Sequence, residues 1–248
     1  MGPSHTMRDT LERFAQDQGI GLVLAVPCGP AAWGVPGAEA EAIQITALFT
    51  RPAAAYLGLA EPADVLRHEG PPAVLAWDTR RALRLVLRSN ATVWSWLGSP
   101  GALIGESAAL AALRALLART LSRQALLGHA LGEAKAAMNT YLPDDPKVAA
   151  RAKYGLVIRP LMAAQWLLDD RDAPPADWAS LRAGLTWTDE ARALLDALEA
   201  DALPERRVAA LDAWIDSVFQ AARDKGEALS PPRRVVLSSK RPRSRPFA

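Results

Sequence analysis

Two hydrophobic periods follow one another along this chain, and the change falls near residue 100. Before that point, short apolar runs cover residues 22–26, 43–49 and 73–77, and the middle run alternates apolar and polar residues. Such runs, bounded by Gly, Pro and Asp, are typical of strands. An amphipathic helix over residues 7–18 precedes them, and Asp78 is placed to cap a helix through residue 88 with Leu83 and Leu87 buried. The first part is therefore predicted to be a small sheet with flanking helices.

After Pro100 the apolar residues recur at helical spacing in segments rich in Ala and Leu, which are strong helix formers. Proline-containing breaks separate these segments, which cover residues 102–121, 125–141, 146–169, 175–200 and 205–225. We therefore predict an α+β protein, in which a mixed sheet with flanking helices is followed by an all-helical domain. The expected boundaries are 1–100 for the α/β domain, 101–228 for the helical domain and 229–248 for a flexible tail.

Charge is distributed unevenly around a net value of +2. Six of the 29 basic residues and none of the 27 acidic residues lie in 231–248, so the remainder carries 23 basic residues and a net charge of −4. A basic tail of this composition is expected to be flexible and able to contact nucleic acid or an acidic partner. In the alternative reading, its six charges have no specific partner.

The sequence shows no membrane span, signal peptide or disulfide framework, and this indicates its cellular compartment. No apolar run approaches the roughly 20 residues that cross a bilayer, and the N-terminal residues do not have the order of a signal peptide. Cys28 is the single cysteine and there are three histidines, which argues against disulfides and against a Cys/His zinc cluster. We expect a cytoplasmic protein without a membrane partner, with Cys28 as an inert thiol and His129 as an ordinary helix residue.

A glycine- and proline-rich loop after Cys28 connects the first two predicted strands, and such loops often carry function. The loop sequence Gly29-x-x-Ala32-Trp33-Gly34 is followed in order by Tyr56-Leu57, Trp77-Asp78, Ser89-Asn90, Trp96-Leu97-x-Ser99-Pro100, Lys153-Tyr154 and Arg159-Pro160-Leu161. This series resembles a bacterial family of predicted nucleotidyltransferases in the DNA polymerase β-like superfamily, a family linked to RNA repair. The resemblance implies a nucleotidyltransferase-like sheet and a helical domain.

The resemblance also implies a catalytic pattern, which this chain lacks. The superfamily carries Gly-Ser in the loop, Asp-x-Asp on the next strand and a third carboxylate on a later strand, which hold two Mg²⁺ ions about 4 Å apart. The matching positions here are Pro30, Glu41, Ile43 and Ala73, and no Asp occurs between residues 28 and 60. We therefore expect no catalytic residues and no cofactor, and the chain is interpreted as a pseudo-nucleotidyltransferase.

Other matching positions remain compatible with nucleotide binding. The resemblance places Gly29, Trp33 and Gly34 in the loop, and basic residues that face a triphosphate in relatives correspond to Lys153 and Arg159. Arg81 is a further candidate from the arginine row after Asp78. A salt-bridged or solvated helix face is the alternative interpretation of these cations. The eight tryptophans are interpreted as packing residues.

Ile43, Ile45, Ala47 and Phe49 share one face of the predicted second strand, and this face is expected to line the former cleft. Either the protein collapses onto this apolar face or a partner covers it. The leading hypothesis is a catalytically inactive binding or regulatory subunit, with a protein partner at the apolar cleft. One alternative is an active enzyme that transfers NMP from an NTP to RNA or protein with Glu41, Glu39 and one Mg²⁺. The other is an RNA-binding module that uses the basic tail.

Overall fold

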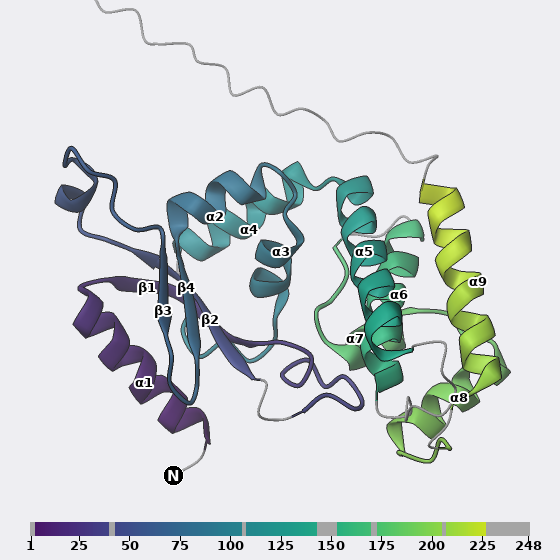
Figure 1. The fold of residues 1–248 in the computed structure, drawn as a ribbon. Helices are drawn as coiled ribbons and strands as arrows, with labels where there is room; N and C mark the ends of the chain where they lie inside the picture. The colour runs from purple at the N-terminus through teal and green to yellow at the C-terminus, as the bar shows by residue number, and fades with distance from the viewer. Residues whose placement is uncertain are drawn as a thin grey trace, which may run out of the picture.

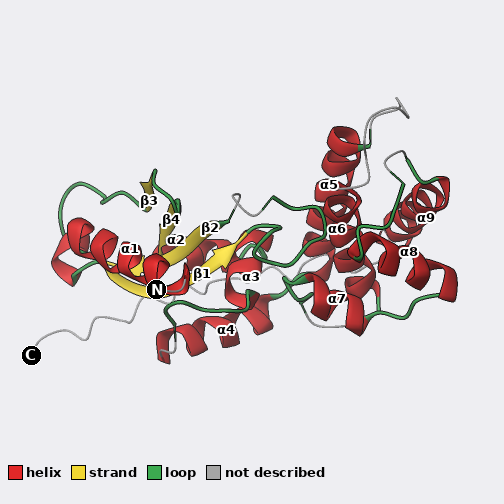
Figure 2. Cartoon of the chain, turned by 90° about the horizontal axis from the view of Figure 1, so that it is seen from below, coloured by secondary structure: helices red, strands yellow, loops and turns green. Residues whose placement is uncertain are grey.

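The computed structural model describes residues 3–39, 43–105, 108–142, 153–169, 173–204 and 207–226. A four-stranded sheet with its helices forms one side of the molecule, and a bundle of helices forms the other (Figure 1). The same division is visible from below, where α1 to α4 lie with the sheet and α5 to α9 lie beside them (Figure 2). The predicted α+β class is confirmed.

The sheet is mixed, with the strand order β1-β2-β4-β3. β1 (Gly21–Cys28) pairs antiparallel with β2 (Gln44–Thr50), β2 pairs parallel with β4 (Val74–Asp78), and β4 pairs antiparallel with β3 (Val65–His68). The three predicted strands are confirmed. The edge strand β3 is an addition, because its four half-buried or exposed residues give too short a pattern to detect.

Helix α1 (Pro3–Gln18) covers one face of the sheet. Leu11 and Phe14 of α1 are buried there against the side chains of Ile45, Ala47 and Phe49, each 0% exposed. The prediction that the face of Ile43, Ile45, Ala47 and Phe49 lines a cleft is therefore wrong. The alternation correctly indicated an apolar face, but the protein's own first helix covers it.

Three helices cover the opposite face of the sheet, namely α2 (Thr79–Val86), α3 (Ala91–Gly98) and α4 (Ala108–Thr120). The predicted cap is confirmed, since the Arg80 backbone N–H donates to Asp78 Oδ1 over 2.8 Å. The predicted buried face of this helix is wrong, because Ala82 and Val86 are buried whereas Leu83 is 38% exposed.

Helix α4 starts later than predicted and packs with the sheet. The preceding segment adds to the free edge of β1, where Ala25 N–H donates to Ile104 O and Leu103 N–H donates to Ala25 O, both over 2.8 Å. Leu110, Leu113 and Leu117 of α4 are then buried in the cluster with α2 and α3. The core of the sheet region thus reaches beyond residue 100 along the chain.

The second region contains α5 (Arg123–Tyr141), α6 (Tyr154–Leu168), α7 (Trp178–Gly184), α8 (Asp189–Glu199) and α9 (Ala209–Gly226). α6 is buried along most of its length, since it packs between α5, α7 and α9. The helix predicted over 175–200 is two helices, because Thr188 caps α8 by accepting from Ala191 N–H at 3.2 Å.

Two further expectations concern membrane-spanning helices and the C-terminal tail. No helix in the described ranges is both long and apolar enough to cross a membrane. The predicted basic tail at 229–248 lies outside the described residues.

Candidate functional site

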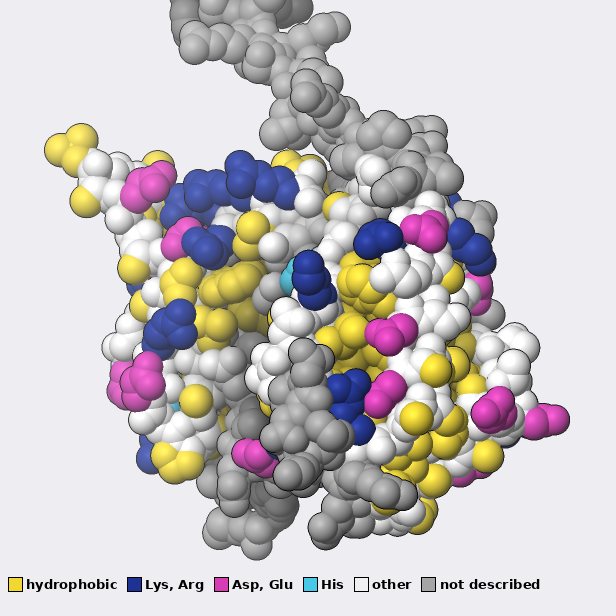
Figure 3. All heavy atoms as spheres, turned by 45° about the vertical axis from the view of Figure 1, so that its right-hand side comes forward, with side chains coloured by type: hydrophobic (Ala, Val, Ile, Leu, Met, Phe, Trp, Pro, Cys, Tyr) yellow, Lys and Arg dark blue, Asp and Glu magenta, His cyan; other side chains and the backbone are white. Residues whose placement is uncertain are grey.

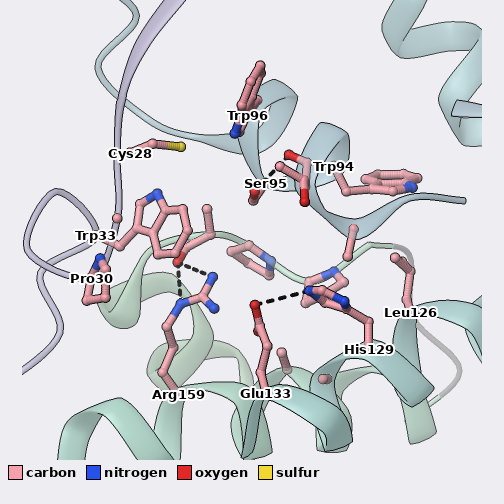
Figure 4. A pocket seen from close by; sticks show the side chains of 18 of the residues that line it. Cys28, Pro30, Trp33, Trp94, Ser95, Trp96, Leu126, His129, Glu133 and Arg159 are labelled. Carbon is pink, nitrogen blue, oxygen red and sulfur yellow. Dashed lines mark hydrogen bonds and ion pairs between the residues drawn. The ribbon is translucent and has the colours of Figure 1, made fainter. Parts of the chain in front are cut away.

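A cavity of about 430 Å³ lies where the sheet meets the helical bundle (Figure 4). One wall comes from the loop after β1, the first residues of β2, and α3; the other comes from α5, α6 and the segment 174–176. We call this cavity the cleft. It lies between the sheet region and the helical bundle.

Gly29 and Gly34 of the loop after β1 have positive φ angles, 106° and 68°, in a backbone region that favours glycine. Trp33 N–H donates to Gly29 O over 3.1 Å, and Trp33 Nε1 donates to Ser99 Oγ over 3.0 Å. On its other side, Trp33 O accepts from Trp178 N–H of α7 over 2.8 Å. Gly29, Pro30 and Trp33 thereby lie in the cleft wall, whereas Gly34 lies outside it.

Arg159 of α6 reaches the cleft from the helical side. Its guanidinium lies 4.3 Å from the centre of the Trp33 ring, within cation–π distance. Nε and Nη2 both donate to Ala176 O, over 3.0 and 2.8 Å. Burial lowers the pKa of Arg159, although an arginine keeps its charge at neutral pH. Nη1 makes no hydrogen bond with the described part of the chain, so this nitrogen remains a donor for a ligand.

His129 and Glu133 of α5 form an ion pair in the cleft wall, with 3.1 Å between His129 Nε2 and Glu133 Oε1 (Figure 4). The hydrogen bond from Glu133 raises the pKa of His129. Burial pushes the pKa of Glu133 upward, but the hydrogen bond and charge of His129, with the charge of Arg159, outweigh it and lower that pKa. The sequence indicated an ordinary helix residue at 129, and the structure adds that this residue pairs with Glu133 and lines the cleft. The i,i+4 spacing of the pair was visible in the sequence, whereas its position in the cleft was not.

The strand positions that face the cleft are Gln44 and Thr46 on β2 and Leu75 on β4. On β2 the cleft-facing residues are offset by one from Ile43, because the odd-numbered residues of this strand face α1. On β4, Leu75 lies two residues after Ala73 and so has the same parity, but Ala73 does not line the cleft. A pair of Mg²⁺ ions needs several carboxylate oxygens converging on one point, and an amide, a hydroxyl and a hydrocarbon do not supply them. The described residues at this cleft therefore do not fit a two-metal centre.

Acidic residues elsewhere near the loop do not complete such a centre. Glu39 accepts a hydrogen bond from Lys153 Nζ over 2.9 Å, and this contact lowers the pKa of Glu39. Glu41 lies outside the described residues. Within the described ranges, no three or more His, Cys, Asp or Glu side chains gather where they could hold a metal ion.

The remaining candidates lie away from the cleft or serve in its wall. Arg81 donates to both carboxylate oxygens of Asp64, over 3.4 and 3.2 Å, and lies 5.2 Å from the centre of the Trp77 ring. Neither Arg81 nor Lys153 is among the residues that line the cleft. Cys28 is in the wall, 3.6 Å from Ser99 Oγ, and burial raises the pKa of its thiol, which disfavours the reactive thiolate.

Three tryptophans also line the cleft, although the sequence indicated packing for all eight. Trp33 comes from the loop, and Trp94 and Trp96 come from α3. Trp96 additionally packs in the sheet core, 4.2 Å from the centre of the Trp77 ring. The cleft thus combines aromatic walls, the hydroxyls and amide of β2 and α3, one buried arginine and one ion pair.

Comparisons with known proteins agree with the predicted ancestry. The sequence model of RlaP, the RNA repair pathway DNA polymerase beta family, matches residues 4–237. The "Uncharacterized protein YcgL" of Bacillus subtilis strain 168 is 26% identical over 193 residues, which are 77% of this chain and 73% of that protein. A crystal structure of a nucleotidyltransferase-like protein from Exiguobacterium sibiricum 255-15 is 12% identical, with 92% of this chain and 75% of that chain covered and a TM-score of 0.33. This chain belongs to the RNA repair pathway DNA polymerase beta family.

Proposed function

We propose that this chain binds a nucleotide in the cleft without two-metal nucleotidyl transfer and acts as a binding or regulatory subunit. The observation that carries the proposal is the chemistry of the three strand positions that face the cleft, Gln44, Thr46 and Leu75. They are the strand residues that line the cleft, and none of them carries a carboxylate.

The expected cost of the missing metal ligands favours a protein that is inactive in nucleotidyl transfer. Removing a group that merely orients a metal ligand typically costs about 10–100-fold in metal affinity or activity. In this cleft the strand positions themselves carry no carboxylate, so the cost to metal-dependent chemistry is expected to be larger. Pro30 has neither a hydroxyl nor a backbone N–H to offer a phosphate from the loop.

Binding is supported by the size and lining of the cleft. A volume of about 430 Å³ lies within the range of roughly 300–1,000 Å³ that holds small molecules. Trp94 offers an aromatic surface to a base, and Gln44 and Ser95 offer polar groups to a base edge or ribose. Nη1 of Arg159 offers a charged donor to a phosphate or carbonyl oxygen.

The proposal is tested by titrating the full chain with each nucleoside triphosphate and monophosphate while tryptophan fluorescence is recorded, once with Mg²⁺ and once with a chelator. Trp33, Trp94 and Trp96 line the cleft and serve as the reporters. We expect saturable quenching by at least one nucleotide, with a Kd that changes less than about two-fold when Mg²⁺ is removed. No saturable signal with any nucleotide, or binding that requires Mg²⁺, would overturn the proposal. The second result would favour the alternative of an enzyme with a rebuilt metal site.

Two variants locate the binding in the cleft. Thr46→Val preserves the side-chain volume and removes a hydroxyl whose internal hydrogen bond to Val26 O is long, at 3.5 Å. It is expected to weaken binding by about five-fold, which corresponds to one lost hydrogen bond. Arg159→Lys keeps the charge but loses the planar fork, and is expected to weaken binding further. Arg13→Ala on the exposed side of α1 is the control and should leave the Kd unchanged.

A further inference from the structure

A second cationic feature lies on the outer surface of the sheet region. Figure 3 shows a run of Lys and Arg side chains along the top of the molecule, at the height that α2 and α4 occupy in Figure 1. The exposed arginines of this region include Arg84 on α2, Arg88 in the turn that follows α2, and Arg119 on α4. We call these three residues the arginine face. None of them lines the cleft.

Hydrogen bonds between the ends of the two helices bring these arginines together. Ser89 Oγ donates to Thr120 O over 2.9 Å and accepts from Ser122 N–H over 2.9 Å. Arg88 precedes Ser89 in the chain and Arg119 precedes Thr120, so their backbones are neighbours at this junction. Arg84 lies in the last turn of α2, four residues before Arg88 in the sequence.

Some arginines of the chain have an acidic partner, whereas these three have none within the described ranges. Arg80, Arg81 and Arg182 form ion pairs with Asp78, Asp64 and the carboxylates of α8. Arg84, Arg88 and Arg119 form no ion pair with any residue in the described ranges. Glu106 is the single acidic residue between positions 79 and 132, and it lies outside the described residues.

Unpaired like charges at this spacing favour an external anion. Arg84 in the last turn of α2 and Arg88 in the turn after it are four residues apart in the sequence and carry like charges, which repel each other. A partner that supplies several regularly spaced anionic oxygens relieves that repulsion, and the arginine fork binds phosphate oxygens in a bidentate manner. α2 and α4 contain no aromatic residue, so the surface offers no stacking platform for bases.

We propose that the arginine face binds the phosphodiester backbone of a nucleic acid without reading its sequence. Its residues are other than those that line the cleft and those of the basic tail sequence. Binding by backbone contacts alone releases counterions, so its affinity falls steeply with salt and is insensitive to base composition.

The test compares two full-length variants with the same loss of charge. Arg84, Arg88 and Arg119 are replaced by Gln in one variant, and Arg241, Arg243 and Arg245 of the tail are replaced by Gln in the other. Gln is nearly as good a helix former as Arg, so circular dichroism is expected to be unchanged in both variants. Binding of labelled single-stranded and duplex RNA is followed by fluorescence anisotropy at several salt concentrations.

The variant of the arginine face is expected to bind about ten- to hundred-fold more weakly near 0.1 M salt, and its salt slope should shrink by about 2 to 3. The tail variant should change the Kd by less than about three-fold. Equal affinity and slope in the wild type and the face variant would overturn the proposal. Loss of binding in the tail variant alone would do so as well, as would binding only to vesicles that contain phosphatidylserine.

The nucleotide titration in the cleft separates this inference from the proposed function. The arginine-face variant is expected to keep its nucleotide Kd, whereas Thr46→Val is expected to keep its RNA Kd. Failure of the RNA experiment therefore leaves nucleotide binding in the cleft standing, and the reverse also holds.

Discussion

The two faces of β2 share one backbone, but one face is packed in the core and the other lines the cleft. Ile45, Ala47 and Phe49 are 0% exposed and pack under α1, where only size and hydrophobicity matter. Gln44 and Thr46 lie between them in the sequence and face the cleft. The difference shows that a shift of one residue separates a packing face from the face that lines the cleft. The absence of a carboxylate therefore bears on metal binding only at the face of Gln44 and Thr46, which lines the cleft.

The largest expected effect is on the packing face. Phe49→Ala leaves a cavity in the core under α1 and is expected to lower the free energy of unfolding by about 3–5 kcal/mol. Urea unfolding followed by circular dichroism measures this loss. Nucleotide affinity in the fraction that remains folded should be unchanged. A loss below about 1 kcal/mol would contradict the assignment of this face to the core.

The next effect couples stability to binding. The Cβ of an alanine at Gly155 of α6 would clash with the backbone carbonyl of Pro36, which belongs to the loop after β1. Gly155→Ala is therefore expected to cost about 1–3 kcal/mol and to displace the wall that carries Trp33. Unlike Phe49→Ala, it should lower thermal stability and nucleotide affinity together. Unchanged affinity in a destabilised variant would show that the cleft does not depend on this contact.

A smaller effect is expected for the stability of Thr46→Val. Because the hydroxyl makes a long hydrogen bond, its removal is expected to change the free energy of unfolding by less than about 1 kcal/mol. Urea unfolding measures this change beside that of Phe49→Ala. A loss comparable to that of Phe49→Ala would contradict the division of β2 into a packing face and a ligand face.

The smallest effect concerns the pH dependence of stability. The raised pKa of His129 gives a contribution that is present below its ordinary value of about 6.5 and is lost as pH rises through the raised pKa. The lowered pKa of Glu133 gives a contribution that is present above its ordinary value of about 4.3 and is lost as pH falls. The pair therefore stabilises most between about pH 4.5 and 6.5.

His129→Gln is expected to remove this contribution, about 0.5 kcal/mol, because both side chains are roughly half exposed, at 46% and 48%. The melting temperatures of the wild type and the variant should differ near pH 5.5 and converge near pH 8.5. Glu133→Gln is the matched variant and should give the same profile. An equal difference at both pH values would contradict the role of the ion pair.

Much of the fold could be predicted from the sequence, because β1, β2 and β4 are apolar runs with clear ends and the bundle helices are rich in Ala and Leu. The face assignment was wrong because an alternating run reveals an apolar face but not the element that covers it. The exposure of Leu83 was missed for a related reason, since α2 turns the smaller Ala82 and Val86 toward the sheet. The local hydrophobic pattern determines the secondary structure, whereas tertiary packing determines which element covers an apolar face.

The candidate site was only partly accessible from the sequence. The family pattern led to Gly29, Trp33 and Arg159, which the fold brings together at the cleft from its two walls. His129 and Glu133 were missed as cleft residues because they lie about a hundred positions from the loop, and only tertiary packing brings them near it. The register of Gln44 and Thr46 was missed because the residues between the loop and β2 carry no marker of strand phase.

The central claim is that this cleft does not perform two-metal nucleotidyl transfer, and pyrophosphate release tests it most directly. The full chain is incubated with each nucleoside triphosphate, Mg²⁺ or Mn²⁺ and bulk RNA, and pyrophosphate is measured by a coupled assay. We predict no release above that of a protein-free blank. Reproducible release that disappears with a chelator and with Glu41→Ala would contradict the claim.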